Sequence, residues 1–272
     1  MKPSTPSDPS RSRLNGLAYT DVGDGPVIVA LHGCPGSVRD WRWLGAALEP
    51  NFRVIRFDLP GFGETPLSVM PDADFAVRAQ WIVDSLAEMG VTEFAVMGHS
   101  AGGPLALEVA AGHPERVMGL ILIGAPGLRP HRAIRKKPAI RRISRLLRVP
   151  VLRTLLTPML RAGFESAGFP TGLPTDSIRQ SMHIIHALSF ERQRENVARV
   201  RAPTLIAWTE DDQFIDQDIS EELADAFSNV ECARFADGGH YLQKTRSTEI
   251  GQAVGVLLGV EAAMESSIPN GV

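Results

Sequence analysis

The segment Met-Gly-His-Ser-Ala-Gly-Gly at residues 97–103 constrains the fold of this chain more than any other. It follows an apolar run at residues 94–97 and precedes a run of helical composition at residues 104–111. A strand, a sharp turn and a helix are therefore predicted in direct succession. Gly98 and Gly102 remove the Cβ atoms that would collide where a strand and a helix approach closely. Such a turn lifts the hydroxyl of Ser100 clear of the backbone.

The same turn would place backbone N–H groups beside Ser100. The first N–H groups of a helix have no partner within the helix, and the N-terminus of a helix carries a partial positive charge. A nucleophile and groups that stabilise an anion are thus predicted at one point. Because a Gly-x-Ser-x-Gly pattern also occurs in plain strand-to-helix connections, the prediction depends on the flanking strand and helix.

Apolar runs alternate with helical spacings along most of the chain. We expect strands at residues 14–22, 27–31, 52–57, 94–97, 117–123, 204–208 and 230–235, and helices at 41–48, 74–89, 104–111, 217–227 and 247–258. Alternation of this kind implies a mostly parallel sheet flanked by helices, with right-handed crossovers. The predicted fold class is therefore α/β, with a core formed by residues 14–125 and 200–259.

Between residues 126 and 199 the alternation stops. This stretch has helical composition, frequent proline and no convincing strand, which predicts a helical cap inserted into the core. Residues 1–13 are rich in Pro and Ser, and residues 260–272 follow the last predicted helix. Both ends are expected to be flexible.

Composition excludes several classes of protein. The chain has 272 residues, of which 44% are hydrophobic and 22% charged, so it can bury a substantial core. Its net charge of -3 argues against a general nucleic-acid binder. No secretion signal is visible at the N-terminus, and no apolar run reaches the roughly 18 residues of a membrane span. Cys34 and Cys232 are too few for a disulfide framework, so a cytoplasmic protein is expected.

A serine hydroxyl needs a base at neutral pH, and the base needs a group that holds its tautomer and stabilises its cation. In open parallel sheets, ligands bind at the carboxyl ends of the strands. His240 lies in a glycine-rich turn after the last predicted strand, so it is the predicted base. His99 adjoins Ser100 in sequence, but we expect it to face away from the hydroxyl.

The orienting acid is expected after the strand at residues 204–208, which ends in Thr-Glu-Asp-Asp at residues 209–212. Asp212 is the predicted acid. Three other carboxylates stay open as alternatives, because adjacent acids also occur in solvated loops: Glu210, Asp211 and Asp237.

His183 and His186 are three residues apart on a predicted cap helix. This spacing would suit two metal ligands, but no third ligand accompanies them. We therefore expect both to line a pocket or to pack, and we expect no metal or cofactor.

The order Ser100, Asp212, His240 along an alternating sheet resembles the α/β-hydrolase fold, in which the catalytic triad follows that order. The likeness extends over about residues 14–259 and includes two further motifs. His-Gly-Cys-Pro-Gly at residues 32–36 is similar to the oxyanion loop of the family, and Asp-Leu-Pro-Gly-Phe-Gly at residues 58–63 is similar to a turn motif. The resemblance implies a serine esterase or lipase-like member with a helical cap.

By the same resemblance, the backbone N–H groups of Cys34 and Ala101 would form the oxyanion hole, and the Cys34 thiol would only pack. Asp212 aligns with the acid of a Gly-x-x-Asp pattern. Thr209 departs from that pattern, because family members usually have Gly at its position. Asp58 is expected to fix a turn near the site.

Related epoxide hydrolases and haloalkane dehalogenases resemble this chain but use Asp where it has Ser100. A serine nucleophile with two oxyanion donors suits acyl transfer instead. We therefore expect cleavage of carboxylic esters with small to medium or lipid-like acyl chains. Two alternatives stay open: a carbon–carbon bond hydrolase of the ring-cleavage type, and a ligand-sensing protein of the same fold.

The predicted cap is strongly basic. It has eleven Lys or Arg residues between positions 129 and 161, and no Asp or Glu lies between positions 117 and 164. Helical spacing separates an apolar face from a basic one, with Ile140, Ile143 and Leu147 against Arg141, Arg145 and Arg148. One interpretation is a lid over the pocket with a solvated basic face. The other is a surface that contacts an anionic membrane or attracts an acidic substrate.

Overall fold

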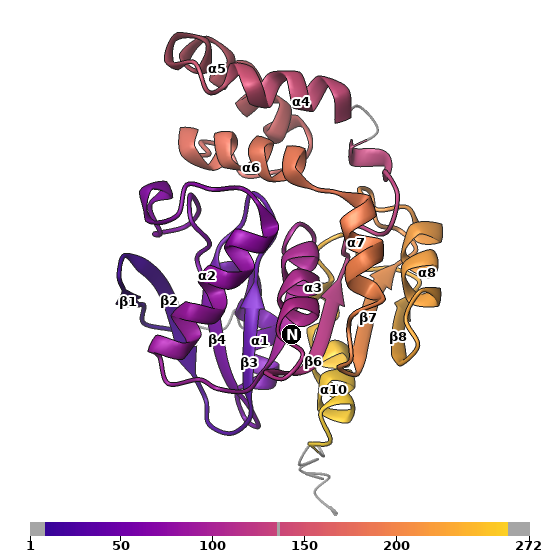
Figure 1. Ribbon diagram of the computed structural model, residues 1–272. Helices are drawn as coiled ribbons and strands as arrows, with labels where there is room; N and C mark the ends of the chain where they lie inside the picture. Colours follow the sequence, from indigo (N-terminus) through magenta and orange to yellow (C-terminus); the bar gives the residue numbers. More distant parts are fainter. Residues whose placement is uncertain (1–8, 135–136, 261–272) are drawn as a thin grey trace, which may run out of the picture.

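The computed structural model describes residues 9–134 and 137–260. At its centre is one eight-stranded sheet with the strand order β1-β2-β4-β3-β5-β6-β7-β8 (Figure 1). β1 pairs antiparallel with β2 and β2 with β4, whereas the other neighbouring strands are parallel, which confirms the α/β class. The strands are β1 (Ser12–Leu14), β2 (Leu17–Val22), β3 (Val27–Leu31), β4 (Arg53–Phe57), β5 (Phe94–His99), β6 (Val117–Ile123), β7 (Thr204–Thr209) and β8 (Val230–Phe235).

The single strand expected at residues 14–22 is wrong, because this segment belongs to a hairpin. Leu14 of β1 pairs with Leu17 of β2, and the chain reverses through Asn15 and Gly16. Both turn residues have positive φ, 49° and 87°. Asn-Gly with two positive φ angles is the turn that two-residue hairpins favour. The described sheet therefore begins at Ser12, ahead of the expected boundary at residue 14.

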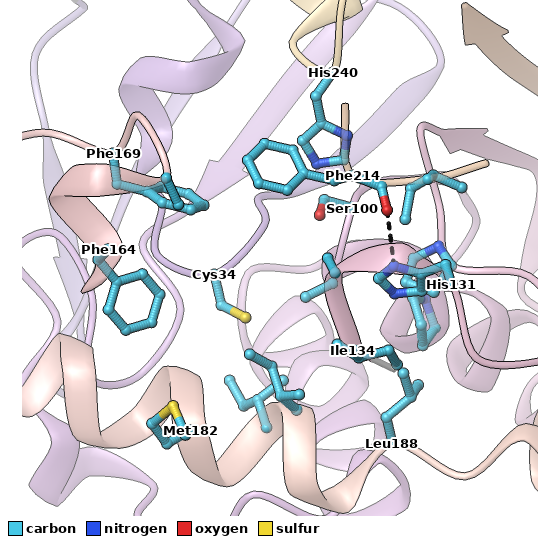
Figure 2. A pocket seen from close by; sticks show the side chains of 18 of the residues that line it. Cys34, Ser100, His131, Ile134, Phe164, Phe169, Met182, Leu188, Phe214 and His240 are labelled. Atoms are coloured by element: carbon cyan, nitrogen blue, oxygen red, sulfur yellow. Dashed lines mark hydrogen bonds between the residues drawn. The ribbon is translucent and has the colours of Figure 1, made fainter. Parts of the chain in front are cut away.

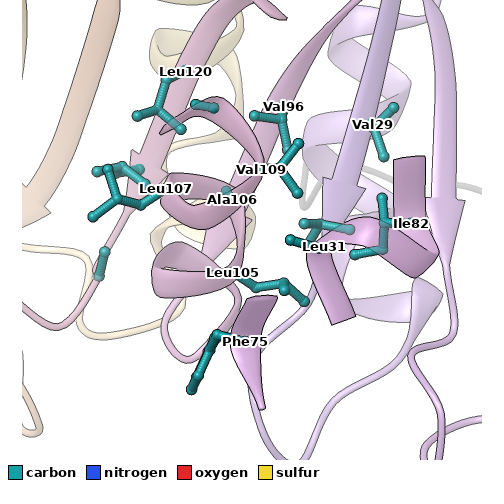
Figure 3. Packing of buried hydrophobic residues seen from close by; sticks show 14 of the residues in the cluster. Val29, Leu31, Phe75, Ile82, Val96, Leu105, Ala106, Leu107, Val109 and Leu120 are labelled. Carbon is teal, nitrogen blue, oxygen red and sulfur yellow. The ribbon is translucent and has the colours of Figure 1, made fainter. Parts of the chain in front are cut away.

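Helices cover both faces of the sheet. One face packs against α2 (Phe75–Glu88), α3 (Gly102–Gly112), α7 (Phe190–Val197) and α8 (Gln217–Asp225), and the other against α1 (Arg42–Leu48), α9 (Leu242–Thr245) and α10 (Ser247–Leu257). Side chains of β3 alternate between these layers. Val29 and Leu31 face α2 and α3 (Figure 3). Ile28 and Ala30 face the other side. β3 is buried on both faces and is apolar throughout, as the sequence predicts. Short 3-10 helices lie at Val38–Trp41, Leu67–Val69 and Arg132–Ile134.

Three helices lie beyond the carboxyl edge of the sheet: α4 (Lys137–Leu146), α5 (Pro150–Ser166) and α6 (Thr175–Ala187) (Figure 1). α6 lies between the sheet and the outer pair formed by α4 and α5. Residues 126–134 and 137–199 contain helices and no strand, as predicted. α7, however, packs on α3, where Arg192 forms an ion pair of 2.5 Å with Glu108. The helices that cover the site therefore end with α6, ahead of the expected boundary at residue 199.

The flexibility expected of residues 1–13 and 260–272 falls mostly on positions 1–8 and 261–272, which lie outside the described residues. Among the helices that the structure describes, none combines the length and the apolar composition needed to cross a bilayer.

Candidate active site

Ser100 occupies the sharp turn between β5 and α3. Its φ is +50°, a conformation that residues other than glycine rarely adopt. A Cβ added at Gly98 would stand 2.3 Å from the carbonyl oxygen of Gly102, and one added at Gly102 would stand 2.1 Å from that of Leu31. The structure thus confirms that close backbone approach requires these two glycines. The turn holds Ser100 at the carboxyl edge of the sheet.

His240 and Asp212 form a buried pair at the same edge. His240 Nδ1 lies 2.8 Å from Asp212 Oδ2, and the two side chains are only 5% and 2% exposed. Asp212 Oδ1 accepts hydrogen bonds from the N–H groups of Phe214 and Ile215, at 2.7 and 3.0 Å. Because an ionised carboxylate only accepts, Nδ1 of His240 carries the hydrogen, which leaves Nε2 as an acceptor. This is the tautomer that a base beside Ser100 requires.

Asp211 has different hydrogen-bond partners from Asp212. Its carboxylate accepts hydrogen bonds from the N–H groups of Gly239 and Gly238, at 2.8 and 3.3 Å, and the bond from Gly239 contributes most to lowering the pKa of the carboxyl. Thr209 donates from its hydroxyl to the carbonyl oxygen of Gly239, at 3.1 Å. Thr209 and Asp211 therefore hold the loop that carries His240, which gives the departure at Thr209 a structural role. The two other candidate acids form ion pairs, Glu210 with Arg234 and Asp237 with Arg246.

His99 supports His240 from the opposite side. Its Nε2 lies 2.9 Å from the carbonyl oxygen of His240, so this nitrogen donates. Burial, and next the neighbouring His240, hold the pKa of His99 well below its usual value. His99 is therefore a neutral group that fixes the backbone of His240.

Ser100 and His240 open onto a cavity of about 320 Å³ between the sheet edge and the cap. Figure 2 shows both residues on one side of this cavity and Phe164, Phe169 and Met182 of the cap region across it. None of its described lining residues is Asp, Glu, Lys or Arg. Four of them have polar side chains: Cys34, Ser100, His131 and His240. The apolar lining includes Phe75, Pro104, Ile134, Met159, Phe164, Phe169, Met182, Ile185, Leu188 and Phe214.

Cys34 and Ala101, the predicted oxyanion donors, line this cavity together with Ser100. The preceding Gly33 lies so close that an added Cβ would stand 3.1 Å from the Cβ of Ser100. Burial raises the pKa of the Cys34 thiol to about 12, so the thiol stays protonated at neutral pH. This protonated state of the half-buried thiol fits the expected packing role of the side chain.

His131 is a site residue that the sequence did not reveal. It lies in the connection from β6 to the cap, and its Nδ1 is 3.0 Å from the carbonyl oxygen of Phe214 (Figure 2). Burial lowers the pKa of His131 to about 4, so the ring is neutral at neutral pH. No motif surrounds it in the sequence, and only the folded cap brings it to the cavity.

The remaining motif residues have structural contacts. Asp58 accepts hydrogen bonds from the N–H groups of Val38 and Glu64, both at 2.8 Å, and so fixes a turn as expected. His183 Nδ1 lies 2.7 Å from the hydroxyl oxygen of Ser144. The described residues contain no group of three or more His, Cys, Asp or Glu side chains suited to hold a metal ion.

Comparison with known proteins reveals consistent similarities. A family model described as the alpha/beta hydrolase fold matches residues 26–247. The 2-hydroxy-6-oxo-6-phenylhexa-2,4-dienoate hydrolase of Comamonas testosteroni is 24% identical, over 86% of this chain and 87% of the relative. A solved esterase from Thermogutta terrifontis aligns with a TM-score of 0.74 and 22% identity, over 92% and 98% of the two chains. A meta-cleavage product hydrolase from Pseudomonas fluorescens IP01 aligns with a TM-score of 0.68 and 23% identity, over 89% and 94%.

Proposed function

This chain belongs to the α/β-hydrolase fold family, and we propose that it is a serine hydrolase that cleaves carboxylic esters through an acyl-enzyme. One observation carries the proposal: Ser100, held at a positive φ, opens with His240 onto an uncharged cavity, and His240 is tied to the buried Asp212. A group that reacts by nucleophilic attack is thereby paired with a base whose tautomer is set.

In the proposed reaction, the oxygen of Ser100 attacks the ester carbonyl while Nε2 of His240 takes the hydroxyl proton. Asp212 stabilises the imidazolium that forms, and its own position is fixed by two backbone N–H groups. The N–H groups of Cys34 and Ala101 would stabilise the oxyanion of the tetrahedral intermediate. His240 then protonates the departing alcohol, and a water activated by the same ring hydrolyses the acyl-enzyme.

The cavity supports a neutral substrate of modest size. Its volume of about 320 Å³ is at the lower end of the range of about 300–1,000 Å³ typical of small-molecule sites. Its lining is apolar apart from Ser100, His131, His240 and the protonated thiol of Cys34. Small to medium acyl esters fit this chemistry.

A second candidate is a carbon–carbon bond hydrolase of the ring-cleavage type, which the names of the Comamonas and Pseudomonas proteins favour. A dienoate substrate carries a carboxylate. Burying an ionised carboxylate without a positively charged or hydrogen-bonding partner costs about several kcal/mol of binding free energy. Arg78 is a buried guanidinium near the site, but it lines a recess of about 10 Å³ that it shares with Cys34. A recess of that size holds about one water. A neutral ester therefore fits the catalytic cavity better than a dienoate does.

The test compares p-nitrophenyl esters of increasing acyl length with a chromogenic 2-hydroxy-6-oxo-dienoate. We expect multiple turnovers on short to medium esters, and kcat/KM on the dienoate at least about a hundredfold lower, the equivalent of about 3 kcal/mol. Ser100→Ala should abolish ester turnover, whereas Ser166→Ala, an exposed change on α5, should not. Faster turnover of the dienoate would favour the carbon–carbon hydrolase, and a slow single turnover on every substrate would favour the ligand sensor.

A further inference from the structure

The outer face of α5 exposes large apolar side chains. Val151 is 68% exposed, Leu155 is 69% exposed and Met159 is 57% exposed. They are spaced four residues apart, so they lie on one face of the helix. The exposed neighbours on that face are uncharged as well: Thr154, Pro158 and Ala162. Of the eight large hydrophobic residues that the described chain exposes, five lie between positions 146 and 159, so apolar exposure is concentrated here.

An exposed cluster of arginines adjoins this apolar face. It comprises Arg141, Arg142 and Arg145 of α4 and Arg148 in the connection to α5. Among the described residues, no acidic side chain pairs with any of these four. The exposed Arg129 differs, since it pairs with Asp218 and Glu222 at 2.6 Å. The positive charge of this cluster is therefore not compensated by acidic side chains among the described residues.

The two features share one layer of the molecule. α4 and α5 form the outer layer of the cap, with α6 between them and the sheet (Figure 1). The side of α4 that carries Ile140 and Ile143 is turned inward, as is Leu147 directly after the helix, which is 1% exposed, and the arginines are exposed on the other side. Met159 belongs both to the exposed face of α5 and to the lining of the catalytic cavity. The exposed surface thus borders the cavity wall.

We propose that this surface, formed by the arginine cluster and the apolar face of α5, docks on an anionic lipid bilayer. Val151 and Leu155 would enter the interface, and the arginines would lie at the lipid phosphates. The 17 residues of α5 make a rod of about 25 Å, suited to lie along the interface. A second copy of this chain fits less well, because the same surface on the other copy offers no Asp or Glu between positions 117 and 164 to pair with the arginines. Docking goes beyond the proposed function and does not depend on it.

The experiment is vesicle flotation at low and high salt. The vesicles are phosphatidylcholine alone, or phosphatidylcholine with one third phosphatidylglycerol. The parent protein should bind only the anionic vesicles, and more tightly at low salt, because salt screens the arginines. Arg141→Gln, Arg145→Gln and Arg148→Gln together should weaken binding at low salt about a hundredfold, which converts to about 1 kcal/mol for each arginine. The corresponding triple change to Lys should keep most of the binding.

Val151→Ser with Leu155→Ser should weaken binding about tenfold at either salt concentration, because an apolar contribution is not screened. Matched controls lie on the core, away from the cap: Val256→Ser, where the side chain is 71% exposed on α10, and Arg199→Gln with Arg201→Gln. These controls should bind as the parent does. Ser100→Ala should also bind normally, so a failed esterase assay and a failed docking test are distinguishable.

Three results would overturn the proposal. The first is a parent protein that floats with neither kind of vesicle, or with both equally. The second is unchanged binding after both the Gln and the Ser substitutions. The third is a stable dimer in light scattering that Val151→Ser with Leu155→Ser dissociates, because a second copy would then cover this face.

Discussion

The core that holds Ser100 and the cap that covers it are built by different kinds of contact. In α3, every residue from Gly102 to Ala111 is buried, and even Glu108 is enclosed, paired with Arg192 and Asn196. In α5, which the structure describes throughout, Thr157 alone is buried. Close packing therefore fixes the reacting groups, while α5, which has one buried side chain, forms an outer part of the cavity wall. Changes on the exposed side of α5 should therefore cost little stability.

The largest expected effect is on kcat and lies in the core, where the adjacent carboxylates of Asp211 and Asp212 have different roles. Asp212→Asn should lower kcat about 10⁴-fold, because an amide in place of the carboxylate favours the wrong tautomer of His240. Asp211→Asn should cost only about tenfold, since it loosens the Gly238–Gly239 backbone without removing the partner of the base. Steady-state kinetics on one short ester measure both variants. Near-normal activity of Asp212→Asn beside a dead Asp211→Asn would reverse the assignment.

A pair of glycines tests the difference in packing. Gly102→Ala should destabilise the protein by about 3 kcal/mol or more, because its Cβ would meet the backbone oxygen of Leu31 at 2.1 Å. Gly163→Ala in α5 meets nothing within 4 Å, so better helix propensity should stabilise it by about 0.5–1 kcal/mol. Urea denaturation gives both values. Equal losses in the two variants would mean that cap and core are packed alike.

A smaller effect, on the pH dependence of stability, is expected at His131, whose ring contacts the carbonyl oxygen of Phe214 in the core. Burial lowers the pKa of the folded ring to about 4, from 6.5 when unfolded. Between these values the unfolded chain binds a proton that the folded chain does not, so stability falls as the pH drops from 6.5 toward 4. The slope is at most about 1.4 kcal/mol per pH unit. His131→Gln should flatten the pH dependence of the unfolding free energy between these two pH values. Identical slopes in the parent protein and the variant would show that His131 is not the cause of the pH dependence.

The core was largely predictable from the sequence, whereas the cap was predictable only in outline. Gly98, Gly102 and the apolar strands follow local rules, so the turn at Ser100 could be derived from residues that lie side by side in the chain. The hairpin at Asn15 and Gly16 was missed although its turn signal was present, because the apolar run on both sides resembled one strand.

The cap gives weaker signals. The presence of helices in the cap can be predicted from its composition. The packing of α7 on the core, however, involves a contact between Arg192 and Glu108, which are 84 residues apart in the sequence. The place of His131 depends on the same long-range packing. Leu155 and Met159 belong to an apolar run that the sequence shows, but which of its members face the solvent is decided by α6 and the core.

The central claim is that Ser100 is the nucleophile of an ester-cleaving enzyme. A p-nitrophenyl alkylphosphonate, which leaves a stable tetrahedral adduct on an active serine, tests it most directly. Peptide mass spectrometry should find one phosphonyl group, on Ser100, and ester hydrolysis should fall in proportion to its incorporation. His240→Ala should react far more slowly, because the hydroxyl then lacks its base. Labelling of Cys34 or of another residue in step with inactivation, or full ester hydrolysis after Ser100 is modified, would contradict the claim.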